Sequence, residues 1–286
     1  MFVLGTGRCG STLVHEVLAR HEGTGFMTNL DDLGVAPSQP WQNTAWRRLP
    51  AGVTKKGGAR FAPTEGYRAI QREVGPVFVD PVRDLTAGDA TPWLRDRLTG
   101  FVTKRADRLG TPVFLHKFTG WPRVGLLDAC FPDALFIEVV RDGRAVANSW
   151  LQMPWWRGHR GPDQWHFGPL PDDLDAIWKA HDRSFPVLAA LGWRLLMDSY
   201  DAARAQLPED RWLRVRYEDV VADPRSRFED LLTGAGLDWT SDFAAGFARY
   251  SFSGSRAEAF RTDLGSRDLA ALDEVLQEPL LALGYR

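Results

Sequence analysis

The sequence predicts an α/β fold in which helices cover both faces of a central parallel sheet. Apolar, strand-like segments alternate with helix-like segments along the chain, the order typical of parallel strands joined by helices. The first strand-like segment runs into a glycine-rich turn and then a helix. The chain has 286 residues, of which 44% are hydrophobic and 25% charged, which is enough apolar material for one large core. We therefore expect a single domain over residues 1–286.

Short apolar runs define the strands, and apolar residues three or four positions apart define the helices. The predicted strands are residues 2–5, 112–117, 134–141 and 211–217. The predicted helices are residues 11–20, 91–109, 121–130, 142–153, 173–206, 224–234, 241–250 and 266–283. Asp142 is expected to cap its helix, and Pro186 to break the long one.

Two stretches lack a clear period and are predicted to be irregular. Residues 24–90 are rich in Gly, Pro and Thr, and we expect loops and short helices there. This region includes a basic tract around Arg47, Arg48, Lys55, Lys56 and Arg60. Residues 154–172 are expected to form a loop.

The charge and cysteine content narrow the class of protein. The formal net charge is −2, so nothing indicates nucleic acid or a membrane surface as a general partner. Cys9 and Cys130 are the two cysteines, too few for a disulfide framework or a metal site. No secretory segment and no run near the ~18 apolar residues of a membrane span is present. We expect a soluble, cytoplasmic protein without a metal.

Residues 5–12, GTGRCGST, have the strand, tight turn and helix start that bind phosphate. Glycines let backbone N–H groups approach an anion, Arg8 adds a full charge, and Ser11 and Thr12 add hydroxyls. The loop lacks the lysine of the triphosphate-binding pattern G-x-x-x-x-G-K-[ST]. An ordinary strand-to-helix turn is the alternative interpretation.

Two further strand ends carry polar side chains. In VVRDGRAVANS, Arg141 ends a strand at the edge where open α/β sheets bind ligands, and Ser149 follows on the next helix. In FLHKFTGWP, His116 and Lys117 end another strand, and a histidine can take a proton from a hydroxyl. The alternatives are an ion pair of Arg141 or Arg144 with Asp142 and a purely structural histidine.

In combination, these motifs resemble the sulfotransferases that use 3′-phosphoadenosine 5′-phosphosulfate (PAPS). The family's 5′-phosphosulfate loop is [KR]-[ST]-G-[ST]-T, which matches Arg8, Gly10, Ser11 and Thr12, with Cys9 in place of a hydroxyl residue. The resemblance spans nearly the whole chain, to the closing Leu-Gly-Tyr. It implies that residues 8–12 bind the 5′-phosphate, that Arg141 and Ser149 bind the 3′-phosphate, and that Tyr217, in RYEDVVADP, contacts adenine. It also implies a phosphate contact from Arg256.

The resemblance implies catalytic roles as well. Many relatives carry the base in an acid-Lys-x-x-P stretch, and here His116 stands in place of the acid, beside Lys117. His116 would accept the acceptor's proton, and Arg8 and Lys117 would stabilise the leaving phosphate without a metal.

The expected activity is sulfuryl transfer from PAPS to a hydroxyl or amine of a small molecule, sugar or lipid, releasing 3′,5′-diphosphoadenosine. A small-molecule kinase and a non-catalytic nucleotide-binding protein remain alternatives. Tryptophans in residues 150–172 either contact the acceptor or pack the loop against the helices: Trp150, Trp155, Trp156 and Trp165.

Overall fold

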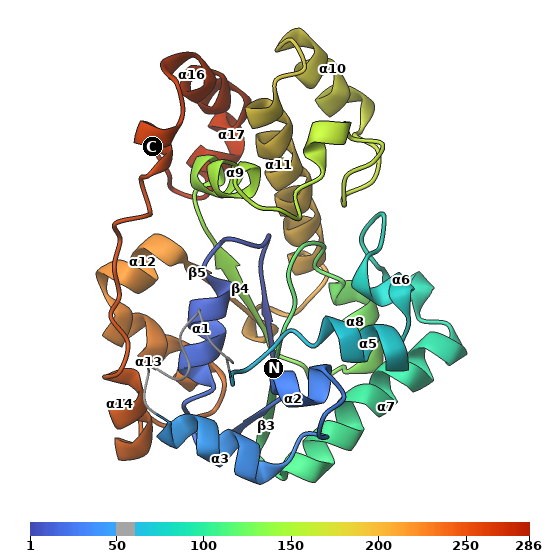
Figure 1. The fold of residues 1–286 in the computed structure, drawn as a ribbon, viewed down its shortest axis with the longest axis vertical. Helices are drawn as coiled ribbons and strands as arrows, with labels where there is room; N and C mark the ends of the chain where they lie inside the picture. Colours follow the sequence, from blue (N-terminus) through green and yellow to red (C-terminus); the bar gives the residue numbers. More distant parts are fainter. Residues whose placement is uncertain (50–60) are drawn as a thin grey trace.

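The computed structural model describes residues 1–49 and 61–286, so Lys55, Lys56 and Arg60 of the basic tract lie outside the described residues. At its centre, five parallel strands form a sheet in the order β2-β3-β1-β4-β5 (Figure 1). The strands are β1 (Phe2–Leu4), β2 (Thr24–Phe26), β3 (Val113–Lys117), β4 (Phe136–Val140) and β5 (Trp212–Arg216). The predicted fold class is confirmed. The sequence missed β2, because three residues in a Gly-rich region give no periodic signal.

Most helices agree with the predicted ones, and the differences are local. The α-helices of the described residues are α1 (Ser11–Leu18), α2 (Asn29–Asp32), α3 (Pro40–Arg48), α5 (Tyr67–Glu73), α6 (Pro76–Val79), α7 (Pro92–Leu109), α8 (Val124–Cys130), α9 (Gly143–Leu151), α10 (Asp172–Ala180), α11 (Phe185–Arg204), α12 (Tyr217–Ala222), α13 (Pro224–Gly234), α14 (Ser241–Phe247), α15 (Phe260–Asp263), α16 (Ser266–Val275) and α17 (Gln277–Ala282). As predicted, Asp142 caps α9, accepting a hydrogen bond from the Arg144 N–H at 2.9 Å.

The long helix predicted at residues 173–206 is two helices, α10 and α11. The break lies just before Pro186, which is in the first turn of α11. A proline is tolerated there because the backbone N–H groups of the first turn have no partner within the helix. The final predicted helix likewise divides into α16 and α17. Short 3₁₀ helices occur at Ala87–Asp89, Gly158–Arg160 and Glu209–Arg211, the second of them inside the predicted loop.

Alternating strand residues feed two separate cores, one on each face of the sheet. On β1, Phe2 and Leu4 pack into a core with α7, α8, α9 and α11, whereas Val3 packs with α1, α13 and α14. Successive strand side chains point to opposite faces, so this division follows directly from the pleat. Both faces of the sheet are therefore covered, and its carboxyl edge is left as the place where polar side chains can gather.

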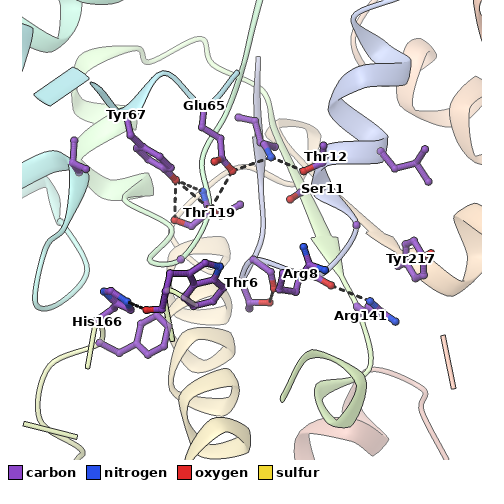
Figure 2. A pocket seen from close by; sticks show the side chains of 18 of the residues that line it. Thr6, Arg8, Ser11, Thr12, Glu65, Tyr67, Thr119, Arg141, His166 and Tyr217 are labelled. Atoms are coloured by element: carbon purple, nitrogen blue, oxygen red, sulfur yellow. Dashed lines mark hydrogen bonds and ion pairs between the residues drawn. The ribbon is translucent and has the colours of Figure 1, made fainter. Parts of the chain in front are cut away.

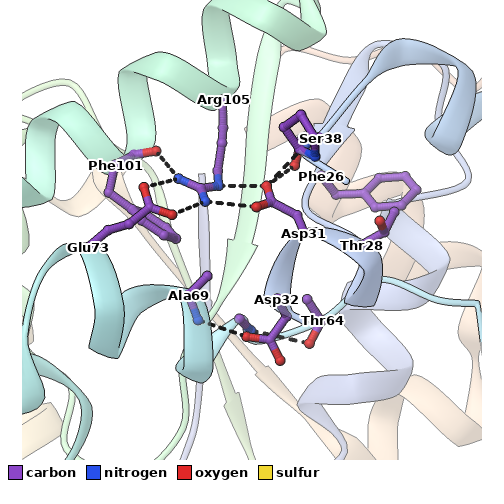
Figure 3. Close-up of polar contacts among 12 residues, drawn as sticks. Phe26, Thr28, Asp31, Asp32, Ser38, Thr64, Ala69, Glu73, Phe101 and Arg105 are labelled. Atoms are coloured by element: carbon purple, nitrogen blue, oxygen red, sulfur yellow. Dashed lines mark hydrogen bonds and ion pairs between the residues drawn. The ribbon is translucent and has the colours of Figure 1, made fainter. Parts of the chain in front are cut away.

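A buried ion network ties α2, α5 and α7 together (Figure 3). The guanidinium of Arg105, 4% exposed, meets both carboxylate oxygens of Asp31 at 2.8 and 2.9 Å and both of Glu73 at 2.6 and 3.0 Å. Asp32 accepts hydrogen bonds from the first backbone N–H groups of α5, including that of Ala69 at 3.0 Å. These contacts fix the start of α5, which forms one wall of a cavity at the carboxyl edge of the sheet.

Candidate active site

A cavity of about 740 Å³ lies at the carboxyl edge of the sheet (Figure 2). Figure 2 shows two sides, with Ser11, Thr12, Arg8, Arg141 and Tyr217 on one and Glu65, Tyr67, Thr119 and His166 on the other. We call these the loop side and the wall side. The cavity is lined by Thr6, Gly7, Arg8, Gly10, Ser11, Thr12, Leu13, Glu65, Tyr67, Val79, Lys117, Thr119, Gly120, Arg141, Trp155, His166, Phe167, Tyr217 and Arg256.

The loop of residues 5–12 has a backbone that only glycine-rich sequence adopts easily. Gly7, Arg8 and Gly10 have φ values of +79°, +59° and +95°. Gly10 is the N-cap of α1, and no side chain caps the helix there. The first N–H groups of α1 therefore have no side-chain partner, and the helix N-terminus presents its partial positive charge to the cavity. This is a geometry that binds an anion.

Cationic side chains from distant segments converge on this loop. Arg8 is exposed, and its Nε donates to the Ser149 hydroxyl at 2.9 Å. Arg141 donates from Nη1 to the Arg8 carbonyl at 3.1 Å and from Nη2 to the Arg256 carbonyl. Its Nε is buried without a hydrogen-bond partner. The ring of Tyr217 lies 4.8 Å from the Arg141 guanidinium carbon. The structure thus brings together all five residues, although Ser149 does not itself line the cavity.

Two close approaches hold the loop in place. A side chain at Gly10 would collide with the ring of Tyr217, so that only glycine allows the ring to lie against the loop. Cys9 is fully buried, and its sulfur packs beneath Gly5. The Cys9 side chain therefore points into the core rather than into the cavity.

Lys117 links the loop side to the wall side. Its Nζ donates to the Thr12 hydroxyl at 2.8 Å and forms an ion pair with Glu65 Oε1, also at 2.8 Å. The Thr119 hydroxyl donates to the same carboxylate at 3.3 Å. Sequence reasoning missed Glu65, since it lies in an aperiodic segment 52 residues before Lys117 and nothing in its neighbours marks it.

His116 lies on the other face of β3 from Lys117. It is 1% exposed, does not line the cavity, and its ring is 4.6 Å from Phe118 and 6.0 Å from Phe114 between ring centres. Its Nε2 is 3.0 Å from the Glu65 carbonyl oxygen, which can only accept, so Nε2 carries the hydrogen. Burial lowers the pKa of His116 to about 3. The pleat explains this placement, since neighbouring strand residues cannot point the same way.

A model of the sulfotransferase family matches residues 1–241. The chain belongs to the sulfotransferase family. No curated protein sequence matches it significantly.

Solved sulfotransferase structures share the fold at low sequence identity. STF9 from Mycobacterium avium is 16% identical with a TM-score of 0.59, over 100% of this chain and 77% of that one. The sulfotransferase domain of the Synechococcus PCC 7002 olefin synthase is 19% identical with a TM-score of 0.53, over 96% and 93% of the two chains. The sulfotransferase domain from the curacin biosynthetic pathway is 15% identical with a TM-score of 0.54, over 100% and 97%.

The wall side of this sulfotransferase is largely aromatic. Trp150 donates from its indole nitrogen to the Gly7 carbonyl at 3.3 Å and stacks on Phe167, with ring centres 5.0 Å apart. Trp155 packs edge-on against Trp150 and lines the cavity while remaining 41% exposed. The other two predicted tryptophans, Trp156 and Trp165, are buried. Packing of the loop therefore holds for Trp150, Trp156 and Trp165, and Trp155 is the one of the four tryptophans that lines the cavity.

The remaining wall groups are neutral or paired. Burial raises the pKa of Tyr67 to about 12, so its hydroxyl stays protonated at neutral pH.

In the part of this sulfotransferase that the structure describes, no three His, Cys, Asp or Glu side chains are grouped as metal ligands. Among the same residues, no helix combines the length and the apolar character needed to cross a membrane.

Proposed function

We propose that this sulfotransferase takes PAPS as its donor and transfers the sulfuryl group to a hydroxyl or an amine. The observation that carries the proposal is the position of Arg141, which contacts the Arg8 carbonyl and lies against Tyr217 while its own Nε has no partner. A donor with a second phosphate, away from the one at the loop, would use this cation. A triphosphate, held along a single chain of phosphates, would have no need for it.

The residues present fit such a donor. The loop of residues 5–12 and Arg8 would hold the 5′-phosphate, since backbone N–H groups at a helix start and an arginine are the usual phosphate ligands. Arg141 would hold the 3′-phosphate together with Ser149, whose hydroxyl now accepts from Arg8. Tyr217 offers an aromatic face for adenine, and Arg256, exposed at the cavity rim, would add charge. When bound, PAPS would supply the sulfuryl group and leave as 3′,5′-diphosphoadenosine.

We assign the general base to Glu65 rather than to His116. Glu65 lines the cavity and holds a carboxylate beside Lys117, whereas His116 is buried on the opposite face of the strand. The carboxylate can accept the proton of an acceptor hydroxyl as the new oxygen–sulfur bond forms. Lys117, already at hydrogen-bond distance from Thr12, is placed to stabilise the negative charge that develops on the bridging oxygen as its bond to sulfur breaks. His116 then helps to position Glu65, because its Nε2–H donates to the Glu65 backbone carbonyl.

Thermal shift with two nucleotides tests the donor assignment. 3′,5′-Diphosphoadenosine, added without Mg²⁺, should raise the melting temperature far more than ATP added together with Mg²⁺. A ligand at a hundredfold excess over its Kd adds about 2.7 kcal/mol to the free energy of unfolding. Equal stabilisation by Mg-ATP would overturn the assignment and favour the small-molecule kinase.

A second measurement separates an enzyme from a nucleotide-binding protein. The protein is incubated with PAPS and pools of hydroxyl and amine compounds, and mass spectrometry follows the gain of one sulfuryl group. Sulfated products that disappear in Glu65→Gln support catalysis at this site. Tight binding of 3′,5′-diphosphoadenosine without any sulfated product would favour the nucleotide-binding protein, and equal product in both proteins would show that Glu65 is not the base.

A further inference from the structure

The wall side of the cavity has an apolar lining that ends in an exposed ring. The Phe167 ring lines the cavity and stacks on the buried Trp150, whose indole nitrogen donates to the Gly7 carbonyl. Trp155 also lines the cavity, with 41% of its area exposed. Val79, on α6, and the ring of Tyr67 complete the lining. An acceptor whose hydroxyl reaches Glu65 would thus lay the rest of its body against flat rings and an aliphatic side chain.

The polar groups of this side are already paired with one another. The Tyr67 hydroxyl accepts from the Thr119 N–H at 3.0 Å and lies 3.2 Å from the Thr119 hydroxyl. Glu65 is engaged by Lys117 and Thr119. A sugar would bring several hydroxyls into this space, and each one beyond the hydroxyl that reaches Glu65 would lose its water without gaining a free partner, which costs binding energy. The wall side therefore disfavours a polyol.

The charges of this side disfavour an anion. Lys117 is paired with Glu65, and His166 lies 2.6 Å from the Trp155 carbonyl oxygen through Nε2 and 3.8 Å from Asp80 through Nδ1. Among the described residues that line the wall side, no cation is left without a carboxylate beside it. A carboxylate or sulfate on the acceptor would lie beside the Glu65 carboxylate, and Lys117, the cation next to it, is already paired with that carboxylate.

We propose that the wall side binds an uncharged alcohol carried on a flat, apolar body such as an aryl ring, in preference to a sugar or an anionic acceptor. The inference rests on the proposed function, because it takes Glu65 as the point where the acceptor hydroxyl sits. It adds the chemical class of acceptor, which neither the family nor the loop side determines. Trp155 is then the specificity-determining residue, since it is the exposed ring at the mouth.

Binding of three probe alcohols to the nucleotide complex tests this. The protein is saturated with 3′,5′-diphosphoadenosine, which cannot react, and titrated with phenethyl alcohol, its para-carboxylate and methyl glucoside, with tryptophan fluorescence or NMR shifts as readout. Phenethyl alcohol should bind about tenfold more tightly than either of the others. Trp155→Ala should weaken its binding about tenfold. Trp41→Ala is the matched control, since Trp41 is 58% exposed on α3 and does not line the cavity, and it should have no effect.

The outcomes distinguish the proposed function from the acceptor class. If 3′,5′-diphosphoadenosine does not stabilise the wild-type protein, the proposed function fails. If it does stabilise the protein but the carboxylate or the glucoside binds as well as phenethyl alcohol, only the acceptor class is overturned. The same conclusion follows if Trp155→Ala binds the nucleotide normally and phenethyl alcohol unchanged. The ranking of the three probes on the wild-type protein needs no variant to fold.

Discussion

The loop side and the wall side of the cavity differ in how their polar groups are satisfied. On the loop side, Arg8 is exposed, Arg141 keeps an unpartnered Nε, and no side chain caps α1 at Gly10. On the wall side, Glu65 and Tyr67 are tied into pairs with neighbouring residues. Unpaired buried donors are costly and persist where a ligand supplies their partner. The difference indicates that the loop side is suited to bind an anionic ligand. The wall side is suited to hold a reacting group in a fixed position.

The two sides also differ in origin along the chain. The loop side is organised around one contiguous segment, residues 5–12, to which single residues from later strand ends are added. The wall side is assembled from segments around α5, α6, β3 and the tryptophan loop, and its position depends on the Arg105 network. We therefore expect variants on the loop side to change nucleotide affinity, and variants on the wall side to change turnover or stability.

The largest effect is expected for the proposed base. Glu65→Gln removes the proton acceptor but keeps the shape, and should lower turnover by roughly 10²–10⁴. Affinity for 3′,5′-diphosphoadenosine should stay near the wild-type value. Glu278→Gln is the control, because the Glu278 side chain is 88% exposed on α17 and should have no effect. Single-turnover rates decide, and a Glu65→Gln protein with normal turnover would contradict the assignment.

His116 should behave differently from Glu65. Because it is buried, His116→Asn is expected to lower the melting temperature while turnover per folded molecule changes little. A large loss of turnover with an unchanged melting temperature would instead support the sequence-based prediction that His116 is the base. The rate, nucleotide affinity and melting temperature need to be measured on one preparation.

The support of the wall side can be removed at Arg105. Arg105→Met leaves Asp31 and Glu73 without their counter-ion, and breaking such a buried pair costs about 3–5 kcal/mol of unfolding free energy. Urea unfolding measures it. Arg83→Met is the matched control, because Arg83 pairs with Asp89 at the surface and its loss should leave stability close to wild type. Equal losses of unfolding free energy in both variants would show that the buried network contributes no more to stability than the surface pair.

The loop side can be divided by the number of phosphates in the ligand. Arg141→Ala should weaken 3′,5′-diphosphoadenosine by 10- to 100-fold, since a hydrogen bond to a charged group contributes roughly 1.5–3 kcal/mol. Adenosine 5′-phosphosulfate, which lacks the 3′-phosphate, should bind almost as before. Arg267→Ala, whose side chain is 87% exposed, is the control. Equal weakening of both ligands would place Arg141 at the 5′ end or give it a structural role.

The smallest effect concerns pH and the buried histidine beneath the wall side. The pKa of His116 is lowered to about 3 in the folded protein and is near 6.5 when unfolded. The unfolded chain therefore binds the extra proton between these values, and stability falls as the pH drops below 6.5, by on the order of 1–2 kcal/mol at pH 5. Burial also lowers the pKa of His15, which acts in the same direction. In His116→Gln the pH dependence should shrink but persist. An unchanged dependence would contradict the account.

Sequence alone predicted most of the fold because each long strand is an uninterrupted apolar run. The prediction failed at β2, because three residues are too short to show a pattern. It also failed at the division between α10 and α11, because the helical pattern continues across the break. Loop-side residues could be found because the loop is contiguous and Arg141 follows a strand directly. Glu65 could not, since its partner Lys117 is reached only through the tertiary fold.

The positions of the neighbours His116 and Lys117 show which constraint the prediction of the base left out. Both residues end β3, but the pleat sends Lys117 toward Thr12 and His116 toward the aromatic side chains on the opposite face. Since the two neighbours point to opposite faces, the expectation that both would act at one site conflicts with strand geometry. The alternation of side chains along a predicted strand is therefore a constraint that can be applied to the sequence itself, because adjacent strand residues rarely serve the same cavity.

Calorimetric titration of 3′,5′-diphosphoadenosine into Glu65→Gln and Arg141→Ala, side by side and without Mg²⁺, tests the division between the two sides most directly. We predict that Glu65→Gln binds the nucleotide with nearly wild-type affinity, and that Arg141→Ala binds it 10- to 100-fold more weakly. Comparable weakening in both variants would contradict the account, because the nucleotide would then not be held by the loop side alone. No weakening in either variant would also contradict it, because Arg141 would then not hold the nucleotide.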